Sequence, residues 1–284
     1  MDELSGELVV VATPIGNLGD LSERAKEVLE SADVICCEDT RHTRVLLSAK
    51  GIPAGGRLIS LHAHNEAAKS EWVIARIDAG ARVAYVSDAG TPGVSDPGAR
   101  LVAAVIGSGN RVTTVPGPSA ALAALVVSGL PMERFCVEGF LPRKGADRAR
   151  RVEALRVEER TAVVFESAPR LATTLDELAE ALGDRPATVC RELTKRYEEV
   201  RRGTLRELAL ERRDDGEARG EIVIVIGGSQ APHADDDDVA LAVAVALRSG
   251  ATTRDAASEV ASSLGVSRRR AYEAALRHGT GGGE

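Results

Sequence analysis

The chain has 284 residues, of which 44% are hydrophobic and only 2% are aromatic, and its formal net charge is -7. This length and composition predict a globular protein of one or two domains whose core is built from Val, Leu, Ile and Ala. The negative charge excludes wholesale electrostatic binding to nucleic acid or to a membrane surface, so any nucleic-acid contact needs a local basic patch.

Cysteine usage and hydropathy indicate where the protein works. Cys36, Cys37, Cys136 and Cys190 show no metal-type or redox spacing. They are expected to be buried and reduced. No signal peptide precedes the first predicted strand, and no apolar run is long enough to span a bilayer. We therefore expect a cytoplasmic protein with no membrane partner.

The first part of the chain alternates strands and helices. Apolar runs predict strands at residues 7–12, 33–37, 57–61, 82–86 and 111–115, and helical spacing follows the first four of them, with residues 38–43 capping the second helix. Repeated alternation of this kind predicts a parallel sheet flanked by helices. Its ligands are expected at the carboxyl ends of the strands, where the sequence turns polar and rich in Gly and Pro.

The segment 85–98 is the richest of these connections. Gly90, Gly93 and Gly98 would let backbone groups approach a ligand closely, and Asp88 and Asp96 supply carboxylates. The helix after it is predicted to begin with Asp96 or Ser95 as N-cap and with Pro97 in its first turn. The alternative is a tight strand–helix connection whose glycines serve only the backbone conformation.

The pattern changes after residue 128. Strands are predicted at residues 135–138, 161–166, 187–193 and 221–226, with helices at 148–158, 168–182 and 205–212. We expect four parts: an N-terminal α/β domain at 1–119, a second, mixed α/β domain at 120–230, an acidic linker at 231–238 and a helical extension at 239–284. Residues 251–276 resemble a helix-turn-helix in which Arg268, Arg269 and Arg270 begin the second helix. A packing hairpin gives the same pattern.

Several common catalytic motifs are absent: the sequence has no P-loop, nucleophile elbow, metalloprotease motif or dinucleotide fingerprint. His62 and His64 could ligate a metal, but a polar loop explains them better, so no metal is expected. Glu38, Asp39, Arg41 and His42 follow the second strand, where they either contact substrate or cap the next helix. Lys195 is either a desolvated base or part of an exposed charge run.

The densest basic cluster follows residue 142. It contains Arg143, Lys144, Arg148 and Arg151 together with Arg150. Arginines at a helix start are electrostatically unfavourable, and a phosphate backbone would be a natural partner for them. Solvated surface charge is the alternative interpretation.

Taken together and in order, nine short motifs resemble the ribosomal RNA small subunit methyltransferase I family, within the tetrapyrrole methylase superfamily. They span residues 13–18, 38–43, 64–66, 87–98, 115–120, 128–131, 139–144, 191–195 and 220–221. The resemblance implies a two-domain tetrapyrrole-methylase-like fold. It also implies methylation, from S-adenosylmethionine, of the ribose 2′-hydroxyl of a cytidine in small-subunit ribosomal RNA.

The resemblance further implies a homodimer and a cofactor folded in the cleft between the two domains. Carried over motif by motif, the expected cofactor contacts are Pro14, Gly16, Asp88, Ala89, Gly90, Val94, Asp96, Ser119, Ala120, Leu141, Leu193 and Glu221. Besides a second copy of itself, the chain's expected partner is the small ribosomal subunit or its RNA.

The candidate catalytic groups are inferred from their positions in the sequence alone. A base would help a ribose hydroxyl attack, and the candidates are Lys195, Asp39 and Glu38, with Arg41 orienting a phosphate or a base. We expect Arg143, Lys144, Arg148 and Arg151 to contact RNA, with residues 268–270 as a second basic segment. Two other hypotheses remain at this point: methylation of a tetrapyrrole or protein side chain on the same fold, and a DNA-binding regulator that uses residues 251–276.

Overall fold

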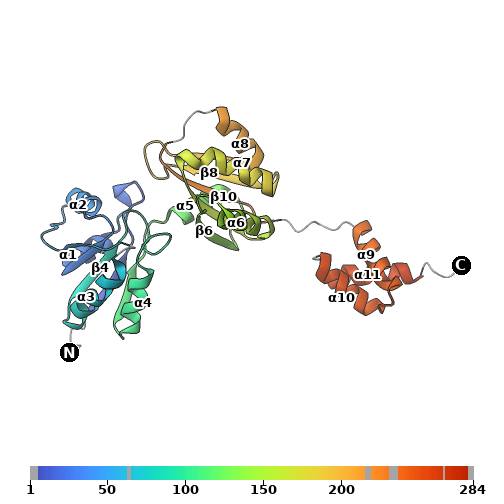
Figure 1. Cartoon of the computed structure of the whole chain (residues 1–284), viewed down its shortest axis with the longest axis horizontal. Helices are drawn as coiled ribbons and strands as arrows, with labels where there is room; N and C mark the ends of the chain where they lie inside the picture. Colours follow the sequence, from blue (N-terminus) through green and yellow to red (C-terminus); the bar gives the residue numbers. More distant parts are fainter. Residues whose placement is uncertain (1–5, 63–64, 215–218, 230–235, 265, 281–284) are drawn as a thin grey trace. The chain divides into compact units, whose positions relative to one another are not determined.

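The computed structural model describes residues 6–62, 65–214, 219–229, 236–264 and 266–280 (Figure 1). It divides after Gly227 into two compact units. Among the described residues, the first unit holds two sheets and the second holds three helices. Within the described ranges, no helix combines the length and apolarity needed to cross a membrane.

The first sheet confirms the predicted α/β alternation. Its five strands are all parallel, in the order β3-β2-β4-β1-β5. The strands are β1 (Glu7–Val11), β2 (Val34–Cys37), β3 (Leu58–Ser60), β4 (Arg82–Val86) and β5 (Arg111–Val115). The connecting helices are η1 (Leu18–Asp20), α1 (Glu23–Ser31), α2 (Thr40–Ala49), α3 (Glu66–Asp78) and α4 (Ala99–Gly107).

Both faces of this sheet are buried, because successive side chains of a strand point to opposite faces. Val9 and Ile35 pack in the cluster that contains helix α1, while their neighbours Leu8 and Cys36 pack against α3 and α4. The strands therefore read as continuous apolar runs in the sequence.

The second sheet is mixed, as predicted, with the order β6-β7-β10-β8-β9. β6 and β7 are parallel and the remaining pairs are antiparallel. The strands are β6 (Phe135–Phe140), β7 (Thr161–Ser167), β8 (Pro186–Arg191), β9 (Glu199–Thr204) and β10 (Glu221–Ile226). The helices are α5 (Ala120–Ser128), α6 (Ala146–Val157), η2 (Ala168–Arg170), α7 (Leu171–Leu182) and α8 (Leu205–Asp214). The sequence analysis did not predict α5 or β9.

One face of the second sheet packs on α6, α7 and α8. The other face, with Val163 and Val225, packs on α5 and on Ile15, which comes from the loop after β1. The two sheets therefore share an apolar contact within the first unit. The predicted α/β architecture, a parallel sheet followed by a mixed one, is confirmed, whereas the predicted domain boundary at residue 119 stays a prediction.

The second unit contains α9 (Asp236–Arg248), α10 (Thr253–Leu264) and α11 (Arg268–Thr280), which pack around a core of their own (Figure 1). Asp236, Asp237 and Asp238 form the first turn of α9, so the predicted linker was wrong over these three residues. Carboxylates are favourable at a helix N-terminus, where they face unpaired backbone N–H groups. The rest of the predicted linker lies at residues 231–235, outside the described residues.

A second correction concerns α4. Its N-cap is Gly98, not Asp96 or Ser95, and Pro97 precedes the helix. The Glu66 carboxylate takes the place of a local cap, because Gly98 N and Leu101 N both donate to it at 3.0 Å. The cap therefore comes from the start of α3, more than thirty positions earlier in the chain.

Candidate functional site

The loops after β1 and β4 are tied together at the carboxyl edge of the first sheet. Thr13 and Gly90 form an antiparallel bridge: Thr13 N donates to Gly90 O at 2.9 Å, and Gly90 N donates to Thr13 O at 3.1 Å. The Thr13 hydroxyl also donates to Ser87 O at 3.2 Å. Gly90 has φ +79°, a conformation that glycine adopts without cost. These contacts fix the start of the loop that carries Asp88 and Asp96.

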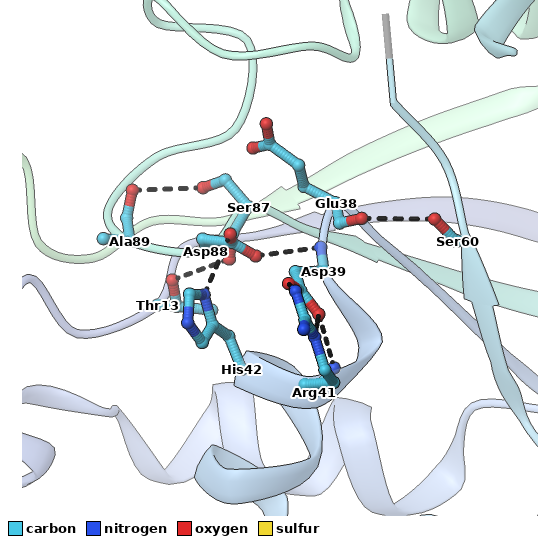
Figure 2. Close-up of polar contacts among 9 residues, drawn as sticks. All are labelled: Thr13, Glu38, Asp39, Arg41, His42, Ser60, Ser87, Asp88 and Ala89. Atoms are coloured by element: carbon cyan, nitrogen blue, oxygen red, sulfur yellow. Dashed lines mark hydrogen bonds and ion pairs between the residues drawn. The ribbon is translucent and has the colours of Figure 1, made fainter. Parts of the chain in front are cut away.

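The loop after β2 joins the same edge through Asp88 (Figure 2). The Asp88 carboxylate accepts from Asp39 N at 3.0 Å and lies 3.1 Å from His42 Nδ1. Asp39 is the N-cap of α2, which confirms the predicted capping role, since its carboxylate accepts from Arg41 N at 2.8 Å. The geometry thus gathers Asp39, Arg41, His42 and Asp88 at one place.

Asp39 and Arg41 also form an ion pair at 2.6 Å. Hydrogen bonds from the Arg41 side chain and backbone hold the pKa of Asp39 well below its usual range. The Arg41 side chain itself is 87% exposed. Asp39 is therefore a weak proton acceptor, and Arg41 presents its guanidinium to solvent.

Glu38 differs from its neighbours. Its carbonyl accepts from the Ser60 hydroxyl at 3.2 Å. In Figure 2 its carboxylate points away from Asp39, Arg41 and His42, and it makes no hydrogen bond to any described residue. Burial raises the pKa of Glu38, and the nearby charge of Asp88 raises it further. Glu38 is thus a half-buried carboxylate with a strengthened affinity for protons.

A cavity of about 660 Å³ opens beside the β4 loop. Its walls come from the loops after β1, β4 and β5, and from β6, β7, η2 and β10. Seven of the twelve predicted cofactor residues line it: Ala89, Gly90, Val94, Asp96, Ser119, Ala120 and Glu221. Burial raises the pKa of Asp96 to about 6, with a further contribution from the charge of Glu38.

The other five predicted cofactor residues lie elsewhere. Asp88 is held by Asp39 and His42 at the β2 side, and Pro14 and Gly16 belong to the loop after β1. Leu141 and Leu193 are 2% and 8% exposed and belong to the apolar cores of the second sheet.

Sequence reasoning missed the aromatic part of the wall. Phe140 and Phe165 both line the cavity, with ring centroids 5.6 Å apart and ring planes inclined at 51°. Because the chain has only three phenylalanines, their positions in the sequence could have indicated where an aromatic wall lies. Ile15 and Val223 add further apolar lining.

Glu166 and Arg148 belong to one buried network behind that wall. The Glu166 carboxylate accepts from the Thr174 hydroxyl at 2.7 Å and pairs with Arg170 at 2.6 Å. Arg148 is 8% exposed, donates to Thr174 Oγ1 at 2.9 Å and pairs with Glu177 at 2.6 Å. The prediction that Arg148 contacts RNA was therefore wrong, because its guanidinium is committed to the interior.

The other predicted RNA contacts remain accessible. Arg143 and Lys144 are exposed, and Arg151 is half exposed and pairs with Glu138 at 3.0 Å. Arg150 pairs with Asp147 on the same helix.

Lys195 lies where the second sheet meets the loop after β1. Its ammonium pairs with Glu192 at 2.9 Å and with Glu221 at 3.0 Å. A Cβ on Gly16 would stand 2.3 Å from Lys195 Cγ, so only glycine leaves room for this stem. Burial works to lower the pKa of Lys195, but the two carboxylates outweigh it and raise that pKa. The side chain is thus held in its charged form.

No group of three or more metal-ligating side chains occurs among the residues that the structure describes. His64 lies outside them. What the site offers instead is a cavity with apolar and aromatic walls, also lined by three carboxylates, those of Asp96, Glu166 and Glu221, and by one arginine, Arg219. A further proton-accepting carboxylate, that of Glu38, lies at the same sheet edge. Such a cavity suits an amphipathic, positively charged ligand of moderate size.

The chain is similar in sequence to known methyltransferases. The family model described as Tetrapyrrole (Corrin/Porphyrin) Methylases matches residues 7–209. Ribosomal RNA small subunit methyltransferase I of Mycobacterium tuberculosis (strain CDC 1551 / Oshkosh) is 49% identical over 282 residues, 98% of each chain. The protein of that name from Escherichia coli O157:H7 is 42% identical, covering 97% of this chain and 96% of its own.

A solved structure shares the fold. Uroporphyrin-III-C-methyltransferase from Thermus thermophilus superposes with a TM-score of 0.55 at 24% identity, over 78% of this chain and 94% of its own. At that identity the likeness concerns the fold alone.

Proposed function

This chain belongs to the tetrapyrrole methylases and, among them, to the ribosomal RNA small subunit methyltransferase I family, and we propose that it methylates the ribose 2′-hydroxyl of a cytidine in small-subunit ribosomal RNA. The observation that carries the proposal is the arrangement of one sheet edge. A cofactor-sized cavity and a proton-accepting carboxylate, Glu38, lie on loops of the same edge.

The chain is a methyltransferase that uses S-adenosylmethionine. The cavity fits this cofactor, because apolar and aromatic walls suit its adenine and alkyl parts, and carboxylates suit its cationic groups. We propose that Asp96, Ser119, Ala120 and Glu221 hold it together with Phe140 and Phe165. When bound, the cofactor supplies a methyl group already activated by its sulfonium sulfur.

The protein's own task is to align the acceptor and remove its proton. A ribose hydroxyl is far from ionised at neutral pH, so a base in reach accelerates its attack. Glu38 suits this role because its raised pKa strengthens its hold on a proton and its carboxylate makes no hydrogen bond within the described part of the chain. Asp39 is a weaker base, and Lys195 is held charged by two carboxylates.

The remaining candidates would bind rather than react. Arg41 presents an exposed guanidinium beside Asp39, and a backbone phosphate of the RNA is its natural partner. Lys195 would act as a positioning residue, since it holds Glu192 and Glu221 together. Arg143, Lys144 and Arg151 would add phosphate contacts on the second sheet's side.

The direct test is methylation of small ribosomal subunits from cells that lack this enzyme, with labelled S-adenosylmethionine as donor. We expect label in 2′-O-methylcytidine after nuclease digestion and mass spectrometry. Label on a base or on a ribosomal protein, or transfer to a tetrapyrrole but not to RNA, would overturn the proposal. Calorimetry with a Gly90→Val variant tests the cofactor site separately: loss of cofactor binding is expected, because a Cβ on Gly90 already approaches Ile15 Cγ2 to 3.3 Å.

We further propose a cytoplasmic homodimer. Leu122 and Val126 lie one turn apart on α5 and are 50% and 67% exposed, and apolar side chains gathered on one helix face are typical of an interface. Light scattering checks this, and a monomer at assay concentrations would contradict it.

A further inference from the structure

The second unit contains a hollow of its own, separate from the cavity in the first unit. It has a volume of about 390 Å³ and lies between α10 and α11, lined by Arg254, Ala257, Ser258, Arg268, Arg269 and Tyr272. Among the described residues that line it, three are arginines and none carries a carboxylate. All six residues come from this unit, so the hollow does not depend on how the two units are placed.

The arginines of this unit divide into structural and available ones. Arg270 donates to Asp236 at 2.8 Å and so ties α11 to the start of α9. Arg269 pairs with Glu273 one turn further on, at 3.4 Å. Arg254 and Arg268 are exposed and make no ion pair with any described residue. Two guanidiniums are therefore free to bind an anion.

The position of Arg268 also favours the binding of an anion. It is the first residue of α11, where the backbone N–H groups already create positive potential, so an arginine there costs stability unless an anion compensates. Nothing in the core of the unit needs these charges, because that core consists of small and aliphatic side chains.

The rest of the lining points to a nucleotide rather than to a simple anion. Tyr272 lies one turn after Arg268 on α11 and is 43% exposed, so part of this aromatic side chain is open to solvent, where a base can stack on it. Ala257, 3% exposed, leaves a shallow floor, and Ser258 adds a hydroxyl. Cations for phosphate, an aromatic face for a base and a small floor are the components of single-stranded nucleic-acid binding.

We infer that this hollow binds an unpaired nucleotide of the RNA substrate, with Arg254 and Arg268 on its phosphates and Tyr272 stacked on its base. The inference rests on the proposed function, which makes small-subunit RNA the substrate. A base-paired duplex keeps its bases stacked inside the helix and would not fill the hollow. The second unit would thus anchor the substrate while the first performs the chemistry.

Binding of the full-length protein to protein-free small-subunit RNA tests the inference, measured over a range of salt concentrations. An Arg254→Gln/Arg268→Gln variant should bind at least about fivefold more weakly, and the slope of log K against log salt should become shallower by about 1.4, for two lost single-strand contacts. An Arg248→Gln/Arg277→Gln variant removes the same charge from this unit outside the hollow and should stay close to wild type. Equal losses of RNA affinity in both double variants would show that the effect comes from net charge alone and would overturn the inference.

Tyr272 supplies an independent test, because it is exposed and its replacement leaves the core intact. Tyr272→Leu should weaken RNA binding about fivefold without changing the salt slope, and Tyr272→Phe should bind like wild type. Unchanged binding by Tyr272→Leu, or tighter wild-type binding to duplex DNA than to RNA, would overturn the inference. Cofactor affinity, measured in parallel, should be unchanged in every variant. Wild-type protein that binds the RNA through the hollow but does not methylate it would refute the proposed function alone.

Discussion

At the scale of single residues, the sharpest expectation concerns Glu38. Its pKa is raised by burial and by Asp88, so the wild-type rate should increase as pH rises through that pKa and Glu38 loses its proton. Glu38→Gln should lower the single-turnover rate of methyl transfer about 100-fold and abolish this acid limb, with cofactor affinity unchanged. Asp39→Asn is the matched control and should retain the limb. A Glu38→Gln enzyme with an intact acid limb would exclude Glu38 as the base.

Asp96, a residue of the proposed cofactor site, has a burial that costs stability. Its pKa of about 6 lies above the ordinary value of 3.8, mainly through burial. The folded state therefore binds more protons than the unfolded state between about pH 4 and pH 6, and stability falls as pH rises through that window.

The Asp96→Asn variant removes that penalty. At pH 8 without cofactor we expect it to gain about 1 kcal/mol, reduced by solvent screening, or roughly 2–4 °C in melting temperature. The gain should vanish below about pH 4, where the unfolded carboxyl is protonated as well. Thermal melts at both pH values measure it, and an equal gain at both would show that the effect is not one of ionisation.

At the scale of elements, the β4–α4 connection depends on two glycines for different reasons. Gly98 has φ +122°, and a Cβ there would lie 2.2 Å from Cε1 of the buried Tyr85 ring. That ring cannot move aside easily, because the Tyr85 hydroxyl donates to Pro97 O at 2.6 Å. Gly98→Ala should cost about 3 kcal/mol or more in the free energy of unfolding.

Gly93 is the control on the same loop. It has φ +83°, but a Cβ there meets nothing within 4 Å. Gly93→Ala should therefore cost only the backbone strain, about 1 kcal/mol. Denaturant unfolding of both variants compares them, and equal costs would mean that the Tyr85 contact contributes nothing.

At the scale of the whole molecule, the two units have separate cores and separate sites. The core of α9, α10 and α11 contains only their own side chains and those of their connections. Every described residue that lines the cavity proposed for the cofactor precedes Gly227. A chain ending at residue 229 should therefore fold and bind S-adenosylmethionine with unchanged affinity, while its affinity for small-subunit RNA falls. Calorimetry and RNA binding measure the two properties, and a truncated chain that folds but loses the cofactor would contradict this division.

Features that depend on near neighbours in the chain could be predicted from the amino-acid sequence. Apolar runs and helical spacing predicted the β/α alternation, because strand and helix periodicities are local. Asp39 could be predicted as a cap because the backbone N–H that it accepts from lies two residues away. The glycine- and aspartate-rich loop at 87–98 and the ordered motifs predicted a cofactor site, seven of whose residues line the cavity.

Which side chains of those segments are free depends on the folded arrangement of the chain. Arg148 looked like its exposed neighbours, but Glu177, 29 positions later, draws it into the interior. The α4 cap comes from Glu66, and Phe140 meets Phe165 across paired strands. Lys195, in the turn after β8, is fixed as a cation by Glu192 and by Glu221, which approaches it from β10. Burial, pairing and pKa depend on partners that are distant in the chain, and local sequence patterns do not contain that information.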